Sequence, residues 1–179
     1  MRSILKSFSV LLACVWWLAP AWAADAPATF KVSEFTFQRP ATWDWVETTS
    51  AMRKAQLKVT DAKTKDSAEV VFFYFGAGGG GGTKANVDRW LGQFQDASKP
   101  KTEEVIIGKT KVTYVQTEGT YLSGLPSGAK TSMPNHALLG AIVEGEEGSV
   151  FIKLTGPKAL AKSAEADFKK MIEGALKKE

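Results

Sequence analysis

The sequence has almost none of the residues on which thiol, disulfide and zinc chemistry depend. Its 179 residues include 1 cysteine, Cys14, and 1 histidine, His136. One cysteine cannot form an intrachain disulfide, and a lone histidine gives no His and Cys ligand set for zinc. No Asn-X-Ser/Thr glycosylation acceptor occurs. We therefore expect no bound metal, no cofactor and no catalytic constellation.

The first 23 residues have the features of a secretory signal peptide. Arg2 and Lys6 precede an apolar run over residues 10–19, and Ala21-Trp22-Ala23 fits a cleavage site. The apolar run is shorter than the ~20 residues that span a bilayer. We predict cleavage after Ala23, a leader at 24–29 and one domain at 30–179. The mature protein would be secreted or periplasmic, without a transmembrane segment.

Cys14 offers an alternative to cleavage after Ala23. Leu-Leu-Ala precedes it at residues 11–13 and resembles the lipobox of bacterial lipoproteins, which would make Cys14 a lipidated N-terminus and the protein an envelope-anchored structural lipoprotein. The residues that follow, VWWLAPAWA, are still apolar, whereas a lipoprotein usually becomes polar there. The sequence favours cleavage after Ala23.

The net charge of the chain is also small. Without residues 1–23, the basic residues fall from 23 to 21 against 19 acidic residues, a net charge of about +2. No basic run occurs beyond the C-terminal Lys-Lys pairs, so nucleic acid is not an expected partner. A protein or small-molecule partner remains.

The hydrophobic pattern predicts a β-rich chain with two helices. Strands are expected over 30–40, 43–47, 51–60 and 69–75, followed by hairpins that turn at residues 108–109 and 145–148. Amphipathic helices are expected over 83–95 and 157–178. Residues 69–75, EVVFFYF, are apolar at both parities, so this strand needs cover on both faces. The fold class is α+β, a mainly antiparallel sheet sandwiched by helices.

Four segments carry a family resemblance: MRKAQ, FFYFGAGGGGG, NVDRWLGQF and FIKLTGP. In this order, and over most of the mature chain, they resemble an uncharacterised family of secreted bacterial proteins without an established activity. The order of elements also resembles, more remotely, the PsbP-like α/β/α fold of extrinsic photosystem subunits and other accessory proteins. The second resemblance implies a shape and transfers no function.

The glycine-rich segment at residues 76–82 matches the letters of a dinucleotide-binding loop but not its context. That motif requires a parallel β-α-β unit with an acidic residue after the second strand. Glu103 and Glu104 instead precede the next strand, which leads into a hairpin. A phosphate loop requires Gly-Lys-Ser/Thr, and the chain has Gly82-Thr83-Lys84. Nucleotide binding is not expected.

A small-anion site is the remaining functional reading of this loop. If 51–60 pairs with 69–75 about Thr64, Val59 opposes Glu69 and Arg53 opposes Phe75, so Arg53 shares the face of Ala55. Arg53 would then lie beside the glycines and the first turn of the helix at 83–95, where free N–H groups favour anions. The predicted anion lip comprises Arg53, Gly78, Gly79, Gly80, Gly81, Gly82 and Lys84. The alternative is that Arg53 pairs with a carboxylate and the glycines form a loop tip. A register shift of one residue would turn Arg53 to the other face.

Two further features have simpler structural explanations. His136 follows the long loop at residues 121–135, and we expect a hydrogen-bonding residue there rather than a catalyst. Trp43 and Trp45 share one strand face, which suits the edge of a core better than an exposed sugar or peptide platform. The sequence predicts a non-catalytic binding or accessory protein. The alternative is an enzyme or binder that uses the anion lip.

Overall fold

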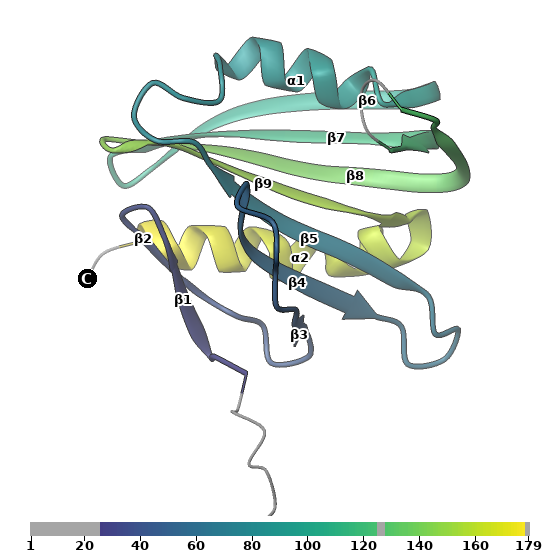
Figure 1. The fold of residues 1–179 in the computed structure, drawn as a ribbon, viewed down its shortest axis with the longest axis horizontal. Helices are drawn as coiled ribbons and strands as arrows, with labels where there is room; N and C mark the ends of the chain where they lie inside the picture. The colour runs from purple at the N-terminus through teal and green to yellow at the C-terminus, as the bar shows by residue number, and fades with distance from the viewer. Residues whose placement is uncertain (1–25, 125–127, 178–179) are drawn as a thin grey trace, which may run out of the picture.

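The computed structural model describes residues 26–124 and 128–177 (Figure 1). The signal peptide, its cleavage site and Cys14 lie outside the described residues. None of the helices within the described ranges is long and apolar enough to cross a membrane.

Nine strands and two helices make up the described chain (Figure 1). The strands are β1 (Thr29–Val32), β2 (Phe35–Gln38), β3 (Asp44–Trp45), β4 (Arg53–Thr60), β5 (Ser67–Tyr74), β6 (Phe94–Ile107), β7 (Thr110–Ser123), β8 (Thr131–Gly145) and β9 (Gly148–Pro157). The helices are α1 (Thr83–Leu91) and α2 (Lys158–Leu176).

Seven strands form one sheet in the order β3-β4-β5-β9-β8-β7-β6, and every neighbouring pair is antiparallel. The predicted hairpin turns at 108–109 and 145–148 are confirmed, because β6 pairs with β7 and β8 pairs with β9 across them. β1 and β2 form a separate hairpin. The predicted mixed α and β class is therefore confirmed.

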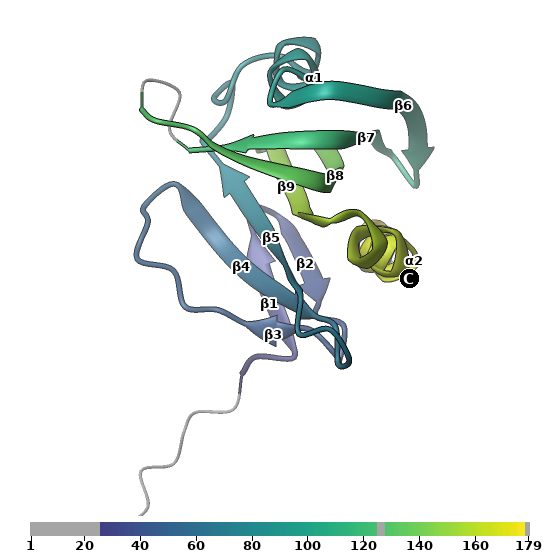
Figure 2. The same cartoon turned by 90° about the vertical axis from the view of Figure 1, so that its right-hand side faces the viewer.

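The two helices pack on opposite faces of the sheet (Figure 2). Phe168 and Ile172 of α2 join a core with Ile152 and Leu154 of β9, whereas Trp90 of α1 joins a second core with Phe151, which points the other way. The α2 stripe expected from the sequence is confirmed. Of its seven residues, Ala175 is half-buried and the other six are buried: Leu160, Ala164, Phe168, Met171, Ile172 and Leu176.

The prediction of a sheet sandwiched by helices is only partly confirmed. On the α2 face, the β1–β2 hairpin shares the cover, with Phe30 and Phe37 in the same core. On the other face, α1 packs on β6 and β7 and leaves β4 and β5 without a helix (Figure 2). A nine-residue helix is too short to cover a seven-stranded sheet. Half of one face is therefore open.

The predicted register of β4 and β5 is wrong by one residue. Val59 pairs with Ala68, not Glu69, because the Asp61 carboxylate accepts hydrogen bonds from the Lys63 and Thr64 amides and fixes a shorter turn. A bulge between Arg53 and Ala55 then adds a residue to β4. Arg53 consequently leaves the buried face of Ala55 and points to the open face.

Two element boundaries also differ from the sequence prediction. The helix expected over 83–95 ends at Leu91, and Phe94 begins β6, although Phe94 still packs with Val87 and Trp90 in one core. The expected long loop at 121–135 is largely strand, because Tyr121 pairs with Met133 and Ser123 with Thr131. His136 therefore lies within β8.

Candidate functional site

The open half of the sheet holds a hollow between the ends of β4 and β5 and the far ends of β7 and β8. Its volume is about 490 Å³, within the size range of small-molecule sites. Its lining is mostly polar and comes from five strands and the segment after β7: Arg53, Ser67, Glu69, Tyr121, Ser123, Gly124, Met133, His136, Thr155 and Gly156. Arg53 at the bulge in β4 lines this hollow together with Tyr121, Ser123 and Met133 from the extended ends of β7 and β8.

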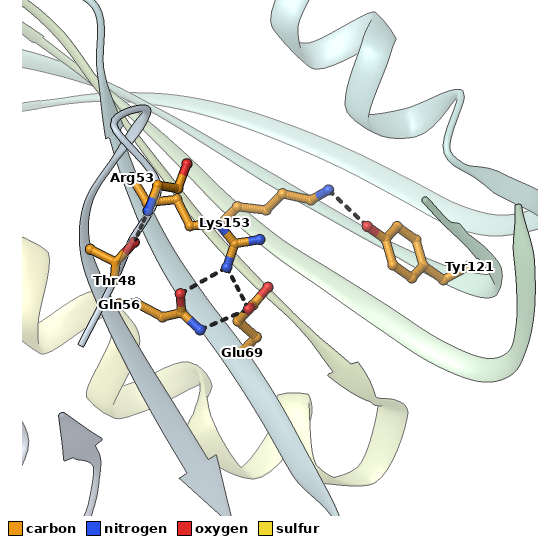
Figure 3. A network of polar contacts seen from close by, with 7 residues as sticks. Thr48, Arg53, Gln56, Glu69, Tyr121 and Lys153 are labelled. Carbon is orange, nitrogen blue, oxygen red and sulfur yellow. Dashed lines mark hydrogen bonds and ion pairs between the residues drawn. The ribbon is translucent and has the colours of Figure 1, made fainter. Parts of the chain in front are cut away.

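Arg53 is held by a carboxylate on one wall of the hollow (Figure 3). Its Nη1 lies 2.6 Å from Oε1 of Glu69 and donates to Oε1 of Gln56 at 2.8 Å. The Gln56 amide donates to the same Glu69 oxygen at 2.8 Å. Both charged side chains are partly exposed, at 33% and 47%. The pair therefore remains accessible to a ligand.

Lys153 lies on β9 and reaches across the open face toward β7 (Figure 3). Its ammonium donates to Oε1 of Gln93 and lies 3.4 Å from the Tyr121 hydroxyl. Burial lowers the pKa of Lys153 to about 8, and repulsion from Arg89 acts in the same direction against the attraction of Glu69. Because a buried ammonium is stable only with compensating partners, this group is poised to accept a counterion.

Tyr121 connects Lys153 to His136. The Lys153 ammonium lies 5.1 Å from the centre of the Tyr121 ring, and the His136 ring stacks on the same ring with centres 6.5 Å apart. Burial raises the pKa of Tyr121, with a smaller contribution from Glu69. The Nδ1 atom of His136 lies 2.9 Å from the Pro134 carbonyl oxygen, so that nitrogen carries the proton and donates. His136 is thus the hydrogen-bonding residue that the sequence suggested.

Asn86 organises the glycine loop at residues 76–82. Its side chain is 2% exposed and its amide donates to the carbonyl oxygens of Gly80 and Gly82 at 2.9 and 3.0 Å. Arg89 donates in turn to the Asn86 side-chain oxygen. The loop thus directs its carbonyl groups toward the Asn86 side chain. A loop that binds an anion instead directs its amide groups toward the ligand.

The structure does not join the two cations of the predicted anion lip. Lys84 pairs with Asp88 at 2.6 Å and its side chain is 88% exposed, whereas Arg53 pairs with Glu69. Arg53 lines the hollow, and neither Lys84 nor Gly78, Gly79, Gly80, Gly81 or Gly82 does. Anion binding by the lip stays a prediction, but its premise, Arg53 on the Ala55 face, is wrong.

Sequence reasoning missed Glu69 and Lys153 as site residues, and it considered Tyr121 only as a possible member of an aromatic platform. Their neighbours are set by strand pairing between distant segments, since β5 pairs with β9 and β7 pairs with β8. One signal was available for Lys153. It is the only charge in the strand sequence SVFIKLT, which follows a hairpin turn and is central to the sheet. A lysine within a central strand usually has a specific environment.

Trp43 and Trp45 do not form an exposed platform. Trp43 is 2% exposed in the main core, and Trp45 packs against that core while its ring nitrogen donates to Glu47. This agrees with the expected core edge.

No protein-family model matches the chain, and no curated protein matches it in sequence. Among solved structures, the fold is similar to the solution structure of CyanoP, the cyanobacterial PsbP of Synechocystis sp. PCC 6803. That match has a TM-score of 0.51 and 9% identity, and it covers 83% of this chain and 92% of that chain. The crystal structure of a protein of unknown function from Pseudomonas aeruginosa matches with a TM-score of 0.49 and 13% identity, over 84% and 96% of the two chains.

At this identity, the likeness to CyanoP concerns the fold alone. It confirms the remote PsbP-like resemblance predicted from the sequence. Membership of the family of secreted bacterial proteins stays a prediction.

Proposed function

We propose that this protein is a secreted or periplasmic, non-catalytic accessory protein that binds a ligand in the hollow on the open half of its sheet. The observation that carries the proposal is the hollow itself. The hollow lies on the uncovered side of the sheet, where β4 and β5 supply a guanidinium, a carboxylate and a hydroxyl group, and β7 and β8 supply a phenol and an imidazole. Concave sites with a few convergent polar groups are the usual form of small-molecule sites.

The contacts within the hollow support a binding role rather than catalysis. His136 is oriented by a backbone carbonyl, not by a carboxylate. Among the described residues, neither Ser67 nor Ser123 hydrogen-bonds to its ring, so no nucleophile is paired with this base. The PsbP-like fold, shared with the cyanobacterial PsbP of Synechocystis, is compatible with an accessory role.

A fragment screen by ligand-detected NMR tests the binding site. Ser67→Trp places a large ring in the hollow from an exposed position at the start of β5, and Ser98→Trp on β6 is the matched control outside it. We expect that fragments that bind the wild type and Ser98→Trp do not bind Ser67→Trp. We also expect that every fragment is chemically unchanged after incubation with the protein. Hits that bind all three proteins equally, or a fragment that is converted, would contradict the proposal.

The proposed location has its own test. When the protein is expressed with residues 1–23 in a Gram-negative host, it should appear in the periplasm or medium. Its intact mass should equal that of a chain whose first residue is Ala24. A mass that begins at a diacylated Cys14 would identify the lipoprotein instead. An unprocessed cytoplasmic chain would contradict both.

A further inference from the structure

The open half of the sheet carries more positive than negative charge. Lys153 of β9 interacts electrostatically with Arg89 of α1, and Tyr121 interacts in the same way with Arg53 of β4. The carboxylate of Glu69 on β5 interacts with both Lys153 and Tyr121. Glu69 is already paired with Arg53. Within residues 26–124 and 128–177, neither Lys153 nor Arg89 forms an ion pair. On the open half, Arg53 and Lys153 against Glu69 leave an excess of one positive charge, to which Arg89 adds a further one from α1.

Lys153 is the cation with the least compensation. Its two polar neighbours, the Gln93 amide oxygen and the Tyr121 hydroxyl, are neutral. An ammonium group has three donors, so one remains for a ligand. Desolvated charges are stabilised by a counterion and by hydrogen bonds that satisfy the remaining donors.

Lys153 is not among the residues that line the hollow, but its ammonium lies 3.4 Å from the hydroxyl of Tyr121, which does line it, and the hollow offers neutral donors as well. Thr155 lies two residues after Lys153 on the same strand, and therefore on the same face of the sheet. The Ser67 and Ser123 hydroxyls and the His136 ring line the rest of the wall. Charged donors combined with hydroxyl donors are the groups that bind carboxylate and phosphate oxygens.

We propose that the hollow binds the oxyanion group of a small acidic molecule, a carboxylate or a phosphate, with Lys153 and Arg53 as its cationic ligands. This inference rests on the proposed function, whose ligand class it names. The occupant is a small molecule because the volume of about 490 Å³ accommodates an anion with a compact body. Glu69 competes with it for Arg53, so that binding loosens the Arg53–Glu69 pair and places the ligand between Arg53 and Lys153.

The proposal predicts a dependence of binding on pH. The titratable and charged groups around Lys153 and Tyr121 that bear on this pH dependence are Arg53, Glu69, Arg89, Tyr121 itself and His136. Burial raises the pKa of Tyr121, so its phenol stays neutral between about pH 7 and pH 9.5. Because the pKa of Lys153 is about 8 in the free protein, its charge is lost over this range. A carboxylate ligand should bind more weakly as the pH rises.

Calorimetric titration with benzoate and, separately, with inorganic phosphate tests the inference. At about pH 7, we expect the wild type to bind at least one of the two, and Lys153→Met to bind it at least about tenfold more weakly. Lys162→Met, which removes an exposed lysine of α2 outside both the hollow and the anion lip, is the matched control and should bind as the wild type does. Binding of benzoate alone or of phosphate alone identifies which source of the oxyanion the hollow accepts.

The pH arm uses benzoate, because phosphate changes its own charge near neutral pH. Wild-type affinity for benzoate should fall at least about tenfold between about pH 7 and pH 9.5, since Lys153 is neutral at the higher value. If phosphate is the ligand, a non-titrating sulfate replaces benzoate. Equal affinity of wild type and Lys153→Met, or no binding of any anion, would overturn the inference. Neutral fragments that still bind in the hollow would leave the proposed function standing.

Discussion

At the scale of single residues, Asn86 explains the most conspicuous segment of the sequence. Six glycines in seven residues match the letters of a dinucleotide-binding loop without its context, and the loop wraps over a buried asparagine whose amide donates hydrogen bonds to its carbonyl groups. Glycine is required where the backbone takes positive φ, as at Gly78 and Gly80. Gly80 has a second constraint, because it packs against the ring of Phe151.

Gly80→Ala and Gly78→Ala separate these two constraints. Both residues have positive φ, +82° at Gly80 and +69° at Gly78. A Cβ at Gly80 would lie 2.6 Å from the Phe151 ring, whereas a Cβ at Gly78 would have no atom within 4 Å. Because Phe151 is buried, we expect Gly80→Ala to be less stable than Gly78→Ala by about 1–3 kcal/mol. Urea denaturation measures the difference. Equal losses of stability in the two variants would mean that the Phe151 ring can move aside at no cost.

Lys153 should make stability depend on pH. Its pKa is about 8 in the folded protein and 10.5 ordinarily, so the unfolded chain binds more protons between these values. Stability from this group therefore rises with pH through that window, and the full penalty is present below it. Lys153→Met removes the penalty and should be about 1–2 kcal/mol more stable than the wild type near pH 7, allowing for partial exposure and lost contacts.

The gap between Lys153→Met and the wild type should narrow toward about pH 10, as Lys153 in the wild type loses its charge. Urea denaturation at both pH values provides the measurement, with Lys84→Met as the control that should follow the wild type. Burial also raises the pKa of Tyr114 to about 12, but this group is common to all three proteins and cancels in the comparison. A gap that is independent of pH would contradict the assigned environment of Lys153.

At the scale of elements, α1 docks on the sheet through one close approach. The ring of Trp90 lies over Gly140 of β8, where a Cβ would be 2.5 Å from the ring. The position of α1, and hence the extent of the open half, depends on the absence of a side chain there.

Gly140→Ala should therefore destabilise the protein by about 1–3 kcal/mol, because Trp90 is buried and cannot yield without moving α1. Gly174→Ala in α2 is the matched control. A Cβ there meets nothing within 4 Å, so alanine should stabilise the helix by about 0.5–1 kcal/mol. Thermal unfolding of the two variants checks both signs. A neutral Gly140→Ala would show that this approach does not hold α1.

The elements that sequence analysis predicted well are those whose signal is local. The α2 stripe and the turns at 108–109 and 145–148 follow from periodicity and turn residues. The bulge at Arg53 and the extension of β7 and β8 over residues 121–135 follow from pairing between strands, which no local pattern reports. The sequence singled out Arg53 as a candidate, but it did not identify its partner Glu69, which depends on the strand pairing.

At the scale of the whole molecule, the sheet is covered unequally. The apolar run at 69–75 predicted cover on both faces, and Val70 and Phe72 do pack toward α2 while Phe73 packs against the opposite core. The short α1 covers the side of that second face formed by β6, β7 and β8 and leaves β4 and β5 without a helix. Combined with the charged residues on β4, β5 and β9, the uncovered side becomes the candidate site. Composition alone, near charge balance, gave no indication of this local excess of positive charge.

The location of anion binding tests the central claim most directly. A ¹⁵N-labelled protein titrated with benzoate or phosphate should show amide shift changes grouped at the hollow, around Ser67, Glu69, Tyr121, His136 and Thr155. The amides of the glycine loop and Lys84 should change little. Shift changes centred on residues 78–84 instead, with the hollow unaffected, would contradict this account and restore the anion lip suggested by the sequence.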